Sequence, residues 1–245
     1  MGKIIQIEGA GDSSLPLVSQ SAAEIAVANF PSLSAWPSVF QAGISGIGFA
    51  DRVTQAAYDL NGAASAATQL VTDAAGVTGY AITNINQAIK VSINTTESFT
   101  LAMCVKGGVS LGSFSSQTNN WSIYHDSAAA SPTWGNIRVG FGGQTLTFAE
   151  YTGPSLTTDN TIWHTLVLIV DRDAQTFELR VDGASAGSKT GVSGAVLSEL
   201  ALGIYNVNGT QGFRVNTFFE PILFNKALNV SELATLESML SGLIE

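Results

Sequence analysis

Charged residues are scarce in this chain, and their scarcity limits the partners that it can bind. Asp, Glu, Lys and Arg make up only 12% of the 245 residues, which is about half of the usual share of roughly 25%. The ten basic residues are scattered, and with nineteen acidic ones they leave a formal net charge of −9. Because phosphate groups are bound by clustered Lys and Arg side chains, we expect no nucleic-acid partner.

Cysteine and long apolar runs are also nearly missing from the sequence. The single cysteine, Cys104, excludes an intrachain disulfide, and its apolar surroundings predict a small buried side chain. No apolar run approaches the roughly 20 residues of a membrane-spanning helix, so we expect no membrane span. The first nine residues lack the basic and apolar regions of a secretory signal. We therefore expect a protein that stays in the cytosol or leaves without a signal, as a virus particle released by lysis does.

The usual catalytic patterns are missing as well. Glycoside hydrolysis needs two carboxylates roughly 5–10 Å apart, and the nearest candidates, Asp171 and Asp173, fall in a predicted turn where Asp hydrogen-bonds locally. The chain has two histidines, no Gly-x-Ser-x-Gly nucleophile elbow and no zinc-binding His-Glu-x-x-His. We expect no enzymatic activity, no catalytic residue and no cofactor.

Alternating apolar residues are the clearest positive signal in the chain. Residues 162–170 are apolar on both faces, which is typical of a strand covered on both sides. Residues 176–181 alternate apolar and polar side chains, as a half-solvated antiparallel strand does. A polar turn joins the two, and Asp182-Gly183 indicates a second tight turn. About ten such short strands from residue 58 onward predict an all-β sandwich of two antiparallel sheets.

One segment near the end of the chain predicts a helix. Asn229 has Glu232 three residues on, and Leu233, Leu236 and Leu240 share one face, which indicates a capped amphipathic helix. We expect this short C-terminal helix to cover an open part of the sandwich.

The first 56 residues differ in their residue pattern from the rest of the chain. A helix is predicted over residues 19–29, with Ser21 as its cap, and an apolar, proline-bearing stretch follows. That stretch is too apolar to be left in water, so it packs either on the main domain or on a partner. We divide the chain into a docking segment, residues 1–56, and a β-sandwich, residues 57–245. The predicted docking residues are Phe30, Leu33, Trp36, Val39 and Phe40.

Several segments, taken in order, resemble the laminin-G-like (concanavalin A-like) jelly roll over residues 57–240. Residues 98–106 resemble the family's S-F-T-L-hydrophobic-W-V-K strand, with Cys104 where tryptophan is usual. Residues 163–183 are similar to its W-H-x-V…V-D-G strand pair, and residues 224–236 to its closing Y-N-R-A-L-S-x-x-E-I-x-x-L. The resemblance implies a jelly-roll sandwich and a structural role for His164. Function stays open, because such folds include glycan binders, adhesion modules, hydrolases and structural proteins.

The resemblance also raises the question of a metal, since laminin-G-like modules often hold one Ca²⁺. Calcium takes six to eight oxygen ligands, and no clustered Asp/Asn loop stands out in the sequence. A structural Ca²⁺ site therefore cannot be assigned. The acidic residues that could contribute ligands are Asp51, Asp59, Asp126, Asp159, Asp173 and Glu220.

Residues 116–126 together with residues 134–136 combine the side chains that a sugar requires, an aromatic platform and planar hydrogen-bonding groups. The alternative for each tryptophan is a core or loop-packing role, as is usual for buried aromatic residues. A second polar loop contains Asn206, Asn208 and Gln211. The predicted ligand-binding residues are Asn119, Asn120, Trp121, Tyr124, His125 and Trp134.

Three functions are compatible with these features. We predict a non-enzymatic structural component of a phage-type virion surface, such as a decoration, fibre or tail protein, whose laminin-G-like module serves adhesion or glycan recognition. It would be assembled in the host cytoplasm, with other virion proteins or further copies of itself as partners and a host-surface glycan as ligand. A free-standing carbohydrate-binding module, cytoplasmic or extracellular, is the alternative, and a glycoside hydrolase is the weakest of the three.

Overall fold

The structure is a computed structural model, and it describes most of the sandwich together with part of the N-terminal segment. The described residues are 21–38, 50–51, 53, 59–60, 70–74, 76–83, 88–92, 97–112, 121–125, 135–157, 161–193, 199–203, 205–207, 210–213 and 216–244. Five predicted site residues lie outside them: Val39, Phe40, Asn119, Asn120 and Trp134.

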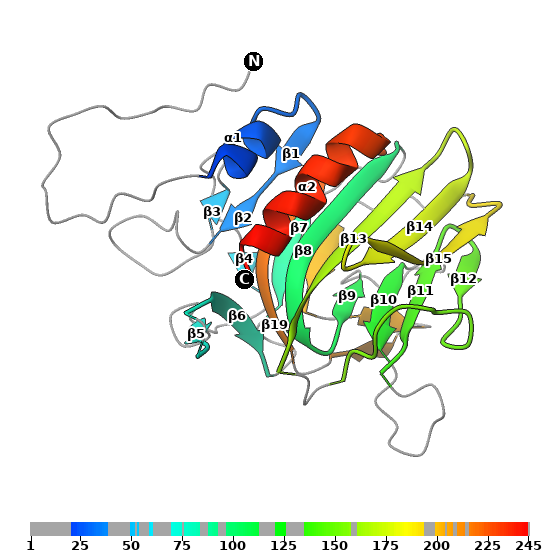
Figure 1. The fold of residues 1–245 in the computed structure, drawn as a ribbon. Helices are drawn as coiled ribbons and strands as arrows, with labels where there is room; N and C mark the ends of the chain where they lie inside the picture. The colour runs from blue at the N-terminus through cyan, green and yellow to red at the C-terminus, as the bar shows by residue number, and fades with distance from the viewer. Residues whose placement is uncertain are drawn as a thin grey trace, which may run out of the picture.

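Two antiparallel sheets form the body of the described structure (Figure 1). The first sheet runs β15 (Ala184–Thr190), β14 (Thr176–Val181), β13 (Trp163–Asp171), β8 (Phe99–Gly107), β19 (Asn216–Phe224), β6 (Thr78–Ile82) and β5 (Leu70–Thr72), and β1 (Leu33–Ala35) also pairs with β19. The second runs β12 (Gln144–Leu146), β11 (Ile137–Phe141), β10 (Ser122–His125), β9 (Ser110–Gly112), β16 (Glu199–Leu202), β7 (Ile89–Ser92) and β4 (Asp59–Leu60). The predicted all-β sandwich is confirmed.

Smaller elements complete the described fold. Two short hairpins pair β17 (Tyr205–Val207) with β18 (Thr210–Gly212) and β2 (Pro37–Ser38) with β3 (Ala50–Asp51). The helices are α1 (Ala22–Ala28) and α2 (Val230–Gly242). Neither helix is long and apolar enough to cross a membrane, and these are the helices of the described residues.

The strand pair predicted from residues 162–183 forms as expected. Leu166 of β13 lies opposite Val181 of β14, and Val170 lies opposite Phe177. Because side chains alternate along a strand, Leu166, Leu168 and Val170 face the interior between the sheets, whereas Val167 faces outward under the helices. Both faces of β13 are therefore covered, which explains its apolar sequence.

Helix α2 covers the outer face of the first sheet, and Figure 1 shows it lying along β8 with α1 beside it. Its buried residues, among them Leu236 and Leu240, meet Ala102 and Cys104 of β8 in a second apolar core outside the sandwich interior. The Cys104 sulfur is fully buried, 3.6 Å from the carbonyl oxygen of Leu240. Burial raises the pKa of the Cys104 thiol, so Cys104 is the small apolar core residue predicted.

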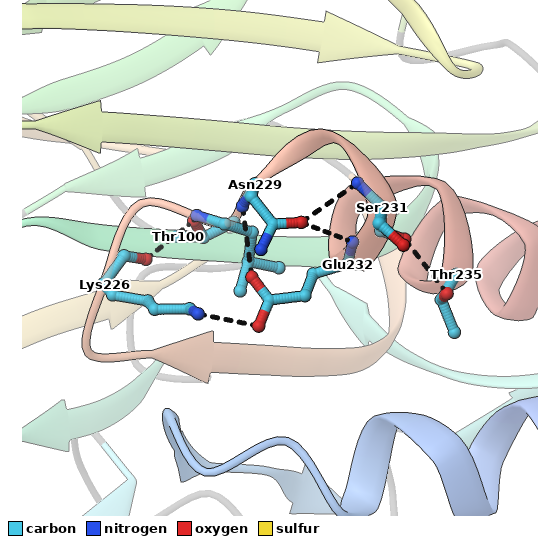
Figure 2. Close-up of polar contacts among 7 residues, drawn as sticks. Thr100, Lys226, Asn229, Ser231, Glu232 and Thr235 are labelled. Carbon is cyan, nitrogen blue, oxygen red and sulfur yellow. Dashed lines mark hydrogen bonds and ion pairs between the residues drawn. The ribbon is translucent and has the colours of Figure 1, made fainter.

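A polar network fixes where α2 begins (Figure 2). The side chain of Asn229 accepts hydrogen bonds from the backbone N–H groups of Ser231 and Glu232, both at 3.0 Å. Glu232 closes the capping box by accepting from the Asn229 N–H at 3.1 Å, and its other carboxylate oxygen lies 2.6 Å from Lys226 Nζ. The hydroxyl of Thr100 donates to the Lys226 carbonyl oxygen at 2.9 Å. The helix start is thus bonded directly to β8, as its position over that strand requires.

The described part of the N-terminal segment packs on the sandwich of the same chain. Strand β1 pairs with β19, so that Leu33 lies opposite Phe224, and the Phe30 and Phe224 ring centroids are 5.9 Å apart. Trp36 is buried, and its indole N–H donates to the carboxylate of Glu220. Of the two alternatives for this segment, Phe30, Leu33 and Trp36 take the first, packing on the main domain. A domain boundary near residue 56 stays a prediction.

Candidate functional site

Two of the predicted ligand-binding residues are core residues. Trp121 and His125 are fully buried, because β10 points them inward with Ile123 between them. The Trp121 ring meets the Phe141 ring edge-on at 6.4 Å, and His125 Nδ1 accepts a hydrogen bond from the backbone of Val109 at 3.0 Å. Trp121 therefore follows its core alternative, and neither side chain offers an exposed face to a sugar.

Tyr124 points to the opposite face of the same strand, away from the sandwich interior. The register of β10 with β11 places Arg138 beside it, and Arg138 Nη1 lies 3.5 Å from the Tyr124 hydroxyl oxygen. The Phe148 ring stands edge-on to the Tyr124 ring at 5.7 Å. The Asn136 amide donates to the carbonyl oxygen of Phe148 at 2.8 Å and so fixes that residue. We call Tyr124, Asn136, Arg138 and Phe148 the Arg138–Phe148 surface.

The members of this surface differ in exposure. Tyr124 is only 8% exposed, so its side chain contributes packing contacts rather than exposed surface. Arg138 and Phe148 are half-buried and present their side chains at the surface of the second sheet. Such a pairing of an apolar ring with an oriented polar group is the usual make-up of a small-ligand site.

Unlike Lys106, Arg180, Lys189 and Lys226, Arg138 has no acidic partner among the described residues. Within the described residues it forms no ion pair, and its one hydrogen bond is the long contact to Tyr124. A guanidinium carries five N–H donors, and the described residues engage one of those of Arg138. Ion pairs join Lys106 to Asp73, Arg180 to Glu237, Lys189 to Glu150 and Lys226 to Glu232.

Small residues lie directly beside Arg138 on the same face. Gly140 follows two residues along β11, and its neighbours across the sheet are Ser122 and Thr145. A side chain carbon built on Gly140 would meet only the Ser122 hydroxyl, at an ordinary 3.5 Å. An added methyl group at Gly140 would therefore make one ordinary contact, to the buried Ser122.

Other charged groups of the described chain hold the fold together. Asp73 accepts hydrogen bonds from Lys106 Nζ at 2.8 Å and Trp163 Nε1 at 2.6 Å. These two donors hold the pKa of Asp73 well below its usual range. The predicted structural residue His164 contacts Asp182 through Nδ1 at 2.7 Å, beside the hairpin turn. These carboxylates are used in joining strands and turns.

Asp171 has the turn role that the sequence predicts for it. Oδ1 of Asp171 accepts a hydrogen bond from the backbone of Ala174 at 2.9 Å. Asp173 lies exposed in the same turn. Asp171 thus closes the turn between β13 and β14 by a local hydrogen bond, which is the ordinary use of Asp in turns.

The described chain gives no basis for assigning a metal. No three His, Cys, Asp or Glu side chains gather within its described residues as metal ligands do. Among the predicted calcium candidates, Asp51 accepts from the Trp36 backbone N–H at 3.1 Å and Glu220 accepts from the Trp36 indole. Asp126 and Asp159 lie outside the described residues, and the Asp59 side chain is not described. A calcium site stays a prediction.

Sequence reasoning missed Arg138 and Phe148. The signal for Arg138 was present in the strand Ile137–Phe141, where apolar residues alternate with Arg138 and Gly140. That alternation places both on the face opposite the core. What the strand could not reveal is that Arg138 forms no ion pair with a carboxylate of the described residues.

No protein-family model and no curated protein sequence matches the chain, but its fold is similar to several solved structures. The binding domain of Paraclostridial Mosquitocidal Protein 1 aligns with a TM-score of 0.59 at 14% identity, covering 86% of this chain and 52% of that one. The receptor binding domain of botulinum neurotoxin type G aligns with a TM-score of 0.56 at 11% identity, covering 85% and 51%.

A third similar structure is that of an enzyme. Trypanosoma rangeli sialidase in complex with sialic acid aligns with a TM-score of 0.57 at 16% identity, covering 87% of this chain and 33% of the sialidase. This chain thus spans about half the length of the two toxin domains and a third of the sialidase. At these identities the likeness concerns the β-sandwich fold.

Proposed function

We propose that this chain is a non-enzymatic binding module that recognises a glycan at the Arg138–Phe148 surface. The observation that carries the proposal is the grouping of a half-buried Phe148 ring with Arg138, which has no ion-pair partner in the described chain. An aromatic ring can cover the apolar face of a sugar, and the guanidinium and the Asn136 amide can bond its polar groups.

The fold lends support by analogy. The structures with similar folds include two toxin binding domains and a sialidase bound to sialic acid. Fold alone does not decide function, so the argument rests on the side chains. Hydrolysis is disfavoured because the described acids near the turns, Asp171 and Asp182, accept structural hydrogen bonds. We also propose that the sandwich is a laminin-G-like domain, as the sequence resemblance implies.

A glycan array tests this function directly. Wild-type protein is expected to bind at least one class of glycan, and Phe148→Ala and Arg138→Gln are each expected to weaken that binding at least about tenfold. Lys226→Gln is the matched control, because it removes one positive charge at the start of α2 on the other sheet. Wild-type protein that binds no glycan, or variants that bind as wild type does, would contradict the proposal.

We further propose that the module serves on a virion surface, attached to other virion proteins or to further copies of itself. Its support is the apolar N-terminal region together with the laminin-G-like resemblance. Because Phe30, Leu33 and Trp36 pack on their own sandwich, attachment would use other residues of that region. Deleting residues 1–20, which leaves α1 and β1 intact, is expected to abolish incorporation into particles. Full incorporation of the shortened chain would overturn this role.

A further inference from the structure

We infer that the glycan bound at the Arg138–Phe148 surface carries a carboxylate, and that Arg138 binds this carboxylate. The inference rests on the proposed function and adds the chemical class of the ligand. It starts from the contrast between Arg138 and four other basic side chains of the described residues, Lys106, Arg180, Lys189 and Lys226, each of which forms an ion pair with an acidic residue.

The charge balance of the chain makes this contrast informative. The protein has nineteen acidic residues against ten basic ones, so carboxylates are the more abundant partners. Even so, the one hydrogen bond of the Arg138 guanidinium within the described residues joins it to the Tyr124 hydroxyl at 3.5 Å, a distance at the limit of hydrogen bonding. A half-buried guanidinium favours a planar, bidentate anion, and the described protein supplies none. A ligand carboxylate completes this arrangement.

The net negative charge of the chain also disfavours a polyanionic ligand. A net charge of −9 repels chains of many like charges, whereas one carboxylate is neutralised by one guanidinium. No second basic side chain belongs to the Arg138–Phe148 surface as the structure describes it. The ligand class is therefore an uncharged glycan skeleton with a single acidic sugar, such as a hexuronate or a sialate, rather than a heavily sulfated chain.

The neighbouring groups fit the rest of such a sugar. The Phe148 ring offers an apolar face, and the Asn136 amide is held in place by its bond to the Phe148 carbonyl. The Asn136 Oδ1 atom remains as an acceptor for a sugar hydroxyl. Gly140 places no side chain beside these groups, and the nearest atom to an added side chain carbon would be the Ser122 hydroxyl at 3.5 Å.

The test compares matched glycans on one array with full-length protein. The panel holds neutral glycans, glycans ending in hexuronate or sialate, the carboxyl-reduced forms of those acids, and sulfated glycans. Wild-type protein is expected to prefer the acid over its reduced form by about 10- to 100-fold in Kd, the range of a charged hydrogen-bonded pair. Arg138→Gln is expected to erase that preference, Arg138→Lys to keep part of it, and Lys226→Gln to leave it unchanged.

Each outcome decides between the two proposals. If wild type binds neutral and reduced glycans as well as the acids, the carboxylate inference fails while the binding function stands. Stronger binding of sulfated glycans also overturns the inference. Binding to none of the panel overturns both. Equal melting temperatures for Arg138→Gln and wild type show that a lost preference is not a loss of folding.

Discussion

The indole Nε1 of Trp163 lies 2.6 Å from Oδ2 of Asp73, a residue 90 positions earlier in the chain. The same carboxylate oxygen lies 2.8 Å from Lys106 Nζ, which also sits 4.8 Å from the centre of the Trp163 ring. Asp73 belongs to the turn that follows β5, whereas Trp163 begins β13 and Lys106 lies near the end of β8. This contact therefore attaches the β5–β6 hairpin to strands in the middle of the first sheet.

Replacing Asp73 by Asn is expected to lower the melting temperature at pH 7. The folded-state pKa of Asp73 lies below its ordinary value of 3.8, so its stabilisation is present above that value and is lost as the pH falls below it. The difference between wild type and Asp73→Asn should accordingly shrink below about pH 4. Asp173→Asn, at an exposed turn position, is the control. A gap that persists unchanged in acid, measured by thermal melts at several pH values, would count against this contact.

Gly79 and Gly140 provide a matched pair of strand glycines. A side chain carbon at Gly79 would lie 2.6 Å from Thr217 Cγ2 and 2.8 Å from the Trp163 ring, whereas at Gly140 the nearest atom is 3.5 Å away. Gly79→Ala should cost about 1–3 kcal/mol of unfolding free energy through overpacking. Gly140→Ala should be neutral or stabilise by up to about 1 kcal/mol. Urea denaturation of both variants checks the order, and equal effects would refute it.

The start of α2 gives a third prediction. Asn229 accepts two backbone hydrogen bonds (Figure 2), so Asn229→Ala is expected to cost about 1 kcal/mol of unfolding free energy. Val230, the next residue, is 85% exposed, and Val230→Ala should stay within about 0.5 kcal/mol of wild type. If both variants unfold at the same urea concentration as wild type, the cap does not anchor the helix.

Mutations at the Trp36–Glu220 contact test whether the N-terminal segment is part of the folded core. Glu220 is buried at a bulge in β19 and has a positive φ of 46°. Trp36→Phe removes the indole N–H that donates to the Glu220 carboxylate. It is expected to cost about 1–3 kcal/mol of unfolding free energy. A double-mutant cycle with Glu220→Gln should give a coupling free energy of at least about 0.5 kcal/mol. Purely additive effects would mean that the two side chains do not support each other.

Local sequence patterns predicted the fold but did not point to the Arg138–Phe148 surface, for a physical reason. Alternation in residues 176–181 is enough to place each side chain on a face, and Asn229 with Glu232 is enough to locate a helix start. Both signals depend on residues close in the chain.

The candidate site depends on contacts between distant strands. Trp121 and Tyr124 are three residues apart, yet Trp121 faces the core and Tyr124 faces outward. The prediction from sequence assigned both to the same ligand-binding loop. Whether Arg138 meets a carboxylate is decided by the register of β10 and β11, which no short motif encodes. Trp36 likewise finds Glu220, 184 residues away, through the fold alone.

The most direct test of the account is an NMR titration that follows side-chain nitrogen signals. Wild-type protein would be titrated with a carboxylate-bearing glycan selected on the array. Binding at the Arg138–Phe148 surface predicts the largest shifts at the Arg138 Nε–H and Asn136 amide signals, together with the backbone amides of β10 and β11. Largest shifts over α2 and β13, or a binding event that leaves the Arg138 signal unmoved, would contradict it.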